Sequence, residues 1–139
     1  MKVGIFPMVG DLLHAGHIAA LNEAKQHCDV LVVALNCNPC DNPNKEKPVE
    51  SVYERYLRVR SLNAVDVVIP YEGEADLELL LKTIEYHVRF IGEDYAKQNH
   101  WTGKEYEMAH DIEHRVIGRE HGLSSTSLKD RIRNSNKRG

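Results

Sequence analysis

The sequence lacks the features typical of membrane, secreted or nucleic-acid-binding proteins. Its 139 residues contain no apolar run near the roughly 20 residues that a membrane-spanning helix requires. Gly10 and Asp11 interrupt the apolar stretch at the N-terminus, so it does not form an export signal. Only three cysteines occur, which favours free thiols in a reducing cytoplasm over a disulfide framework. A formal net charge of only −3 does not favour binding to nucleic acid. Together, these features lead us to expect a cytoplasmic protein without a membrane or nucleic-acid partner.

What the sequence does contain is an alternation of apolar runs and helical patterns along its whole length. Apolar residues make up 42% of the chain, and the length suits a single domain spanning 1–139. Short β-branched runs predict strands, whereas apolar residues spaced by three and four predict amphipathic helices. Segment 93–111 is polar and lacks a clear period, while Ser51 and Glu54 predict a capping box. The predicted strands are 2–6, 29–36, 65–70, 88–92 and 114–118, and the predicted helices are 16–27, 51–63, 75–87 and 124–133.

The order of these elements predicts an α/β fold of the doubly wound, Rossmann-like type. Strands that alternate with helices form parallel sheets with right-handed crossovers, so we expect a five-stranded parallel sheet with helices on both faces. In such sheets, ligands bind beyond the carboxyl ends of the strands. This rule selects the loops 7–16, 92–95 and 118–125, and each of them carries notable polar residues.

Two histidines three residues apart, in the stretch GDLLHAGH, stand out in the first of these loops. As a zinc site, His14 and His17 lack the further protein ligands that zinc requires. Cys37 and Cys40 form a single CxxC in a proline-rich loop, where the helix of a thioredoxin-like motif is not expected, so ordinary thiols are the preferred interpretation. No G-x-S-x-G elbow indicates a serine nucleophile.

Phosphate binding and an ordinary surface position remain as interpretations of the histidine pair. The predicted helix that begins at Gly16 offers backbone N–H groups and the positive end of its dipole. Gly16 also leaves space for a ligand to approach closely. Histidines at this place would add donors to the same phosphate oxygens. From the residues alone, both interpretations stay open.

The stretch DLLHAGH (11–17) resembles the HxGH signature of the nucleotidylyltransferase superfamily. Among its branches, the chain is most similar to the cytidylyltransferases, especially the glycerol-3-phosphate cytidylyltransferases. REHGLSSTSLKDRI (119–132) resembles the second motif of that family, in which an arginine precedes a helix start rich in serine and threonine. Between the two motifs, YERYLRV, VDVVIP and IGEDY match the family in order and spacing, so the resemblance covers nearly the whole chain.

The resemblance implies transfer of CMP from CTP to a small phosphorylated polyol or alcohol, with release of pyrophosphate. It also implies Mg²⁺ or another divalent cation with the nucleotide. Chemistry of this kind needs alignment and charge compensation more than covalent catalysis. The implied catalytic residues are His14, His17, Lys45 and Arg119. The nucleotide would be bound by Val9, Gly10, Asp11, Gly16, Gly92, Asp94, Ser124, Ser125 and Thr126, the metal by Asp11, and the acceptor by Asn38, Lys47, Arg55 and Trp101.

Several of these residues also have a plain structural interpretation. Lys45 and Lys47 fit a solvated charge run equally well. Asp11 would serve simply as a turn-forming residue, and Arg55 as an ordinary exposed helix charge. Asp66 is similar to a family position at a dimer interface, so the resemblance implies a homodimer.

The chain departs from the family pattern at three places. Val9 stands where the family usually has a threonine, so a hydroxyl contact to phosphate is missing or is replaced by a backbone N–H. Asn38 stands where the family often has an aspartate, and segment 93–111 is longer than in the smallest members. Trp101 lies in that segment and either lines the acceptor pocket or packs beneath the segment. These departures point to an acceptor other than glycerol phosphate.

Two other functions agree with the same motifs. HxGH does not specify the base, so the alternative enzyme is an adenylyltransferase that acts on a sugar phosphate such as a heptose phosphate. The changes at Val9 and Asn38 are also consistent with a catalytically silent nucleotide-binding domain.

Overall fold

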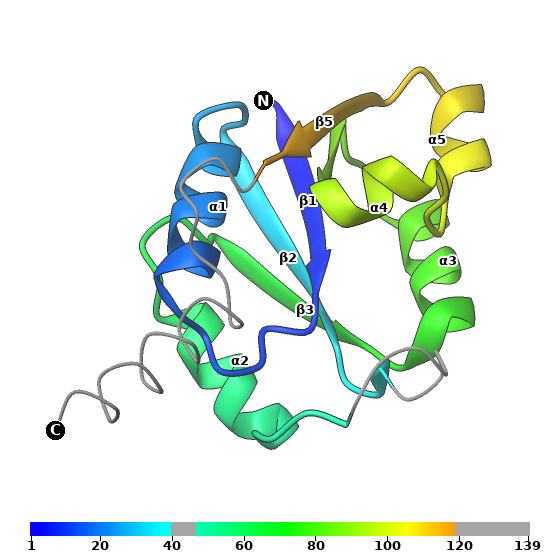
Figure 1. Cartoon of the computed structure of the whole chain (residues 1–139). Coiled ribbons are helices and arrows are strands. Elements are labelled where there is room, and N and C mark those ends of the chain that lie inside the picture. Colours follow the sequence, from blue (N-terminus) through cyan, green and yellow to red (C-terminus); the bar gives the residue numbers. More distant parts are fainter. Residues whose placement is uncertain (40–46, 119–139) are drawn as a thin grey trace, which may run out of the picture.

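The computed structural model describes residues 1–39 and 47–118 (Figure 1). None of the helices in these ranges is long and apolar enough to cross a membrane. The strands are β1 (Val3–Met8), β2 (Val30–Asn36), β3 (Val67–Tyr71), β4 (Val88–Gly92) and β5 (Glu113–Ile117). The helices are α1 (Ala15–Lys25), α2 (Val52–Arg60), α3 (Gly73–Thr83), α4 (Glu93–Gln98) and α5 (Lys104–Ala109).

The five strands form one parallel sheet in the spatial order β3-β2-β1-β4-β5. Strand β1 is central, with Val3 opposite Val30 of β2 and Gly4 opposite Val88 of β4. This sheet confirms the predicted Rossmann-like fold. The direction in which successive strands are added reverses between β1 and β4. Such a reversal is the switch point at which open α/β sheets bind ligands.

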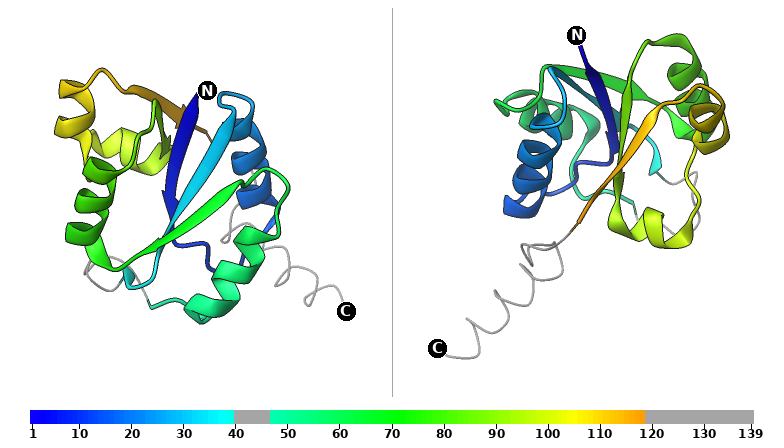
Figure 2. Two further views of the ribbon diagram at one scale, coloured as in Figure 1. Left: turned by 180° about the vertical axis from the view of Figure 1, so that it is seen from behind. Right: turned by 90° about the horizontal axis from the view of Figure 1, so that it is seen from above.

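Helices α1 and α2 cover one face of the sheet, and α3, α4 and α5 cover the other (Figures 1 and 2). Strands β1, β2 and β3 supply side chains to both layers, because successive side chains of a strand point to opposite faces. Phe6, Leu21 and Val59 belong to the apolar cluster beneath α1 and α2. Ile5 and Leu77 belong to the cluster beneath α3. The central strands are therefore buried on both faces, in agreement with their near-continuous apolar sequences.

Helix α2 begins with the predicted capping box. The Ser51 hydroxyl accepts a hydrogen bond from the Glu54 N–H at 3.2 Å, and the Glu54 carboxylate accepts one from the Ser51 N–H at 3.2 Å. Helices α1, α2 and α3 all end earlier than predicted, at Lys25, Arg60 and Thr83. None of these ends is followed by the glycine that commonly marks a helix C-terminus, so the sequence leaves them poorly defined.

Segment 93–111 contains two helices that the sequence does not predict, α4 and α5. Each has six residues, fewer than two turns, so apolar positions cannot repeat at the helical period. Asn99, with φ of +54°, ends α4, and Gly103, with φ of +89°, precedes α5. The predicted helix 124–133 lies outside the described residues.

Candidate active site

The loop between β1 and α1 lies at the carboxyl end of the central strand, where the order of the sheet reverses (Figure 1). Its path includes two residues in the left-handed region, Gly10 with φ of +69° and Leu12 with φ of +48°. A Cβ at Gly10 would lie 3.2 Å from Val59 Cγ2 and 3.3 Å from Leu35 Cδ1. This position therefore requires glycine for its conformation and for the space beneath α2. Gly10, predicted to bind the nucleotide, is buried and shapes the loop from below.

His14 and His17 lie at the start of α1, where they form a reciprocal cap. The Gly16 N–H donates to His14 Nδ1 at 2.9 Å, and the His14 N–H donates to His17 Nδ1 at 3.1 Å. The centroids of the two rings are 4.1 Å apart, and the ring planes are inclined by 50°. A ring nitrogen that accepts a hydrogen bond carries no proton, so each neutral imidazole has its proton on Nε2.

In this cap, two backbone N–H groups donate to the Nδ1 atoms, and the Nε2–H group of each ring becomes the donor to a ligand. Each amide N–H polarises a ring through Nδ1, and hydrogen bonds in a chain strengthen one another, so each Nε2–H becomes a better donor to an anion. The two rings lie beside the positive end of an 11-residue helix, where anions bind favourably. The geometry therefore favours the phosphate-binding interpretation of the pair over an ordinary surface position.

Asp11 contacts the backbone that leads into α2. Its Oδ1 accepts a hydrogen bond from the Glu50 N–H at 2.9 Å, and its Oδ2 accepts one from the Val49 N–H at 3.0 Å. In the part of the chain that the structure describes, no group of three or more His, Cys, Asp or Glu residues could hold a metal ion. Mg²⁺ commonly keeps several waters and binds substrate phosphates beside one or two carboxylates. The metal-binding role of Asp11 stays a prediction, and its observed role is to hold two loops together.

Arg55 is almost completely buried, at 2% exposure, so the interpretation as a solvated helix charge is wrong. Its guanidinium donates to the backbone carbonyls of Val9 at 2.9 Å and Asn36 at 2.6 Å, with longer contacts to the carbonyls of Cys37 and Glu50. The structure gives Arg55 a positioning role, because its donors are directed to the loops after β1 and β2. Helical periodicity offered a signal for this burial, since Arg55 lies four residues before the buried Val59.

Four other residues predicted to bind ligands lie on the connections after β2 and β4. Asn38 is exposed after β2, and its N–H donates to Asn36 Oδ1 at 3.0 Å. Lys47 is exposed on the same connection. Gly92 is the N-cap of α4, and Asp94 is exposed in the first turn of that helix. Asn38 and Gly92 therefore lie at the edge of the sheet that also carries the histidines, and their roles in ligand binding stay predictions.

Trp101 is held within the segment that carries α4 and α5. Its Nε1 donates to Glu107 Oε1 at 3.1 Å, and its ring meets His114 edge-on with centroids 5.0 Å apart. Glu107 is fully buried and was not singled out in the sequence. These contacts support the packing interpretation of Trp101 over the lining of an acceptor pocket.

Several predicted site residues fall outside the described residues: Lys45, Arg119, Ser124, Ser125 and Thr126, together with Cys40 of the CxxC pair. Cys37 is described, and burial raises the pKa of its thiol. A raised thiol pKa lowers the fraction of reactive thiolate, which agrees with an ordinary thiol at this position.

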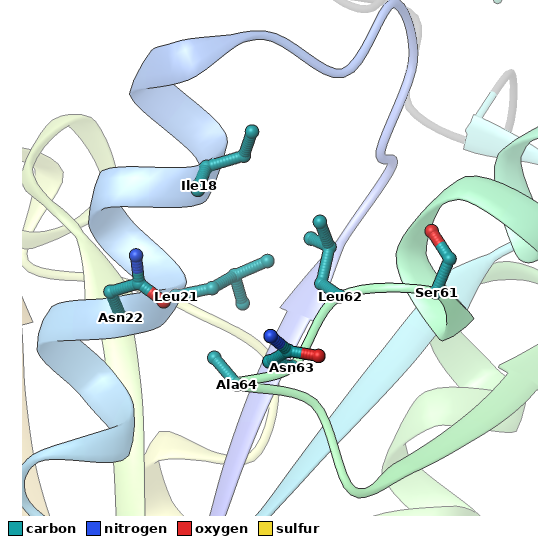
Figure 3. Close-up of a pocket in the computed structure, with 7 residues that line it drawn as sticks. All are labelled: Ile18, Leu21, Asn22, Ser61, Leu62, Asn63 and Ala64. Carbon is teal, nitrogen blue, oxygen red and sulfur yellow. The ribbon is translucent and has the colours of Figure 1, made fainter.

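One pocket of about 260 Å³ lies between α1 and the turn that follows α2 (Figure 3). Ile18, Leu21 and Asn22 line it from α1, and residues 61–64 line it from the turn. The pocket contains none of the residues predicted to bind phosphate. It is therefore distinct from the candidate active site around the histidine pair.

Comparisons with known proteins show the family to which the chain belongs. Residues 5–131 match the cytidylyltransferase-like family. The chain belongs to this family. Membership confirms the resemblance drawn from the HxGH motif and places the chain among the nucleotidyltransferases.

Two curated relatives of this family member are both named bifunctional protein HldE. The protein from Chromohalobacter salexigens is 36% identical over 124 residues, which cover 88% of this chain and 26% of the relative. The protein from Edwardsiella ictaluri is 33% identical over 135 residues, which cover 96% of this chain and 27% of the relative. The chain thus spans about a quarter of the length of these relatives.

Solved structures show the same fold. A lipopolysaccharide core biosynthesis protein from Thermoplasma volcanium superposes with a TM-score of 0.66 at 24% identity, covering 85% of this chain and 95% of that protein. Pantothenate synthetase from Thermus thermophilus superposes with a TM-score of 0.59 at 16% identity, covering 85% of this chain and 55% of the synthetase.

Proposed function

We propose that the chain transfers a nucleotidyl group from a nucleoside triphosphate to the phosphate of a small phosphorylated sugar or polyol. An oxygen of the acceptor phosphate attacks the α-phosphorus and forms a new P–O bond. The bond from the α-phosphorus to the bridging oxygen breaks, and pyrophosphate leaves. The observation that carries the proposal is the pair of backbone N–H bonds to Nδ1 of His14 and His17 at the start of α1, from which we infer that Nε2 of each ring is the donor.

The role proposed for the two histidines is to stabilise negative charge on the phosphate oxygens. This charge develops as the bond to pyrophosphate lengthens, and donors that are already in place stabilise it without reorganisation. Lys45, Arg119 and the serine-rich segment after it are proposed to clamp the remaining phosphate oxygens, as the resemblance implies. A divalent cation on the nucleotide and a homodimeric assembly belong to the same proposal.

CTP is the first candidate for the donor, because the motifs resemble those of the cytidylyltransferases. ATP is the second, with a sugar phosphate such as a heptose phosphate as the acceptor. Both relatives described above bear the name HldE rather than that of a glycerol-3-phosphate cytidylyltransferase, and Val9 and Asn38 depart from the latter pattern. These two observations support the second candidate as much as the family description supports the first.

Calorimetric titration of the full chain with CTP and ATP in the presence of Mg²⁺ distinguishes the two donors. Pyrophosphate release is then measured with the preferred nucleotide against a panel of phosphorylated polyols and sugars. Tighter binding of ATP would remove the cytidylyl candidate. Tight nucleotide binding without turnover on any acceptor would favour a silent nucleotide-binding domain and contradict the proposal.

The histidine site is tested with His17→Ala. Because one oxyanion donor is lost, we expect the transfer rate to fall by about 10²–10³-fold, with the far-UV circular dichroism of the wild type retained. His27→Ala, just beyond the other end of α1, is the matched control and should turn over at the wild-type rate. Near-normal turnover by His17→Ala would place the reaction elsewhere in the molecule.

A further inference from the structure

Two acidic side chains link the loop after β1 to the segment just before α2. Each carboxylate accepts backbone N–H groups of the other segment. The Asp11 carboxylate accepts the N–H groups of Val49 and Glu50. In return, Glu50 Oε1 accepts the Leu12 N–H at 2.7 Å. Each acid thus holds the backbone of the segment that carries the other. Leu12 and Glu50 are 38 residues apart in the sequence, so nothing in the local sequence requires their contact.

Glu50 is unusual for an ionisable residue on a connection, because its side chain is only 5% exposed. Its Oε2 lies 2.6 Å from Arg58 Nε, and the Arg58 side chain is itself 56% exposed. A buried carboxylate is tolerated where charge and hydrogen bonds compensate its lost hydration. Here the Leu12 amide gives Oε1 its hydrogen bond, and the Arg58 guanidinium places a positive charge beside Oε2, which has no hydrogen-bond partner among the described residues. We call these four residues, Asp11, Leu12, Glu50 and Arg58, the clasp.

The clasp acts on the part of the loop that leads directly into the histidines. Leu12 has a positive φ of +48°, a conformation that non-glycine residues rarely adopt and that surrounding contacts must maintain. It stands two residues before His14, whose own N–H donates to His17. Arg55 links the same two segments by a separate route, because it donates to the carbonyls of Val9 and Glu50.

We propose that Glu50 is a positioning residue for nucleotidyl transfer, which holds the histidine loop through the Leu12 amide and touches no substrate. The inference rests on the proposed function, since it assigns the histidine loop the catalytic role. Neither its position nor its role follows from the HxGH motif or from the second motif near the C-terminus.

The test compares three variants of the full chain on the same acceptor. Glu50→Ala removes the acceptor of the Leu12 N–H, so kcat should fall by about 10²-fold, as expected when donors lose their alignment, while KM for the nucleotide stays close to the wild type. Glu50→Gln keeps an oxygen for the Leu12 N–H and should restore most of the activity. Glu54→Ala breaks the exposed capping box of α2, the helix that follows Glu50, leaves the Leu12 contact intact and should keep the wild-type kcat.

A second measurement is independent of turnover. Amide hydrogen exchange should show that the Leu12 N–H is protected in the wild type and that this protection is lost in Glu50→Ala. The ¹⁵N spectra of the His14 and His17 rings should show a smaller population of the Nε2–H tautomer in that variant. Unchanged kcat in Glu50→Ala after loss of Leu12 protection would overturn the positioning role, and so would an equal loss of kcat in Glu54→Ala. If the wild type transfers nothing, the proposed function fails. The exchange and tautomer data then decide separately whether Glu50 holds the histidine loop.

Discussion

Removal of the buried Glu107 carboxylate should destabilise the fold more than any surface change. Glu107 lies on α5 with no exposure, and its two oxygens receive hydrogen bonds from four side chains. Tyr86 Oη and Arg89 Nη1 contact Oε2 at 2.8 and 2.9 Å. Trp101 Nε1 and His114 Nε2 contact Oε1, each at 3.1 Å. Glu107 therefore joins α5 and the segment before it to β4 and β5.

The magnitude follows from what Glu107→Ala leaves behind. Arg89, with a side chain only 6% exposed, loses its counter-charge, and three further donors lose their acceptor. Deleting one partner of a buried ion pair costs about 3–5 kcal/mol. Domains of this kind have a total unfolding free energy of about 5–15 kcal/mol. A loss of this size corresponds to a fall of about 10 °C or more in Tm.

Urea denaturation of the wild type and two variants measures this cost. Glu107→Gln keeps the shape but places an NH₂ donor against two other donors, so its loss should be intermediate. Glu105→Ala, on the exposed side of the same helix, is the control and should unfold like the wild type. A free energy of unfolding for Glu107→Ala within about 1 kcal/mol of the wild type, no more than one ordinary hydrogen bond, would refute this account.

Two further predictions concern the loop and the acid response of the fold. Gly10→Ala should cost about 1–3 kcal/mol of unfolding free energy, because its φ is positive and its Cβ would meet packed side chains. Gly92→Ala, at φ of −64° with its nearest contact at 3.9 Å, should be nearly neutral in the same denaturation assay. The hydrogen bond from Lys25, helped by the Leu31 N–H and opposed by burial, lowers the pKa of Asp66. Ionised Asp66 therefore stabilises the fold above the unfolded value of about 4, and this contribution is lost as pH falls through the lowered pKa. Stability curves of the wild type and Asp66→Asn should differ at neutral pH and converge in acid; curves that stay parallel would contradict this assignment.

The sequence predicts the elements whose pattern is local and long enough to repeat. The strand 88–92 matches β4 at both ends, and the capping box of Ser51 and Glu54 is present as predicted. Helices α4 and α5 have no such pattern, because six residues cannot display a helical period. The burial of Arg55 had a periodic signal but a charged side chain, which favours solvent unless partners compensate it.

The buried acids that join distant segments escape local patterns for a different reason. Glu50 bonds Leu12 across 38 residues, and Glu107 bonds Tyr86 across 21, so their partners become visible only when the sheet brings the segments together. The histidine motif, in contrast, is local, since both rings are fixed by backbone groups within three residues. Contacts within a short motif can be predicted from the sequence. Contacts between residues far apart in the sequence can be identified only once the fold is known.

The same distinction bears on two of the departures from the family pattern, at Val9 and Asn38. At position 9, the contact that fixes the loop is made by the backbone carbonyl, which accepts a hydrogen bond from Arg55 at 2.9 Å. At position 38, it is the backbone N–H that donates to Asn36 Oδ1. Neither loop contact uses the side chain of Val9 or Asn38, so these two backbone contacts do not depend on the side chain at either position. The resemblance assigns both side chains to ligand binding, so we expect a change at either position to alter the choice of substrate more than the path of the loop.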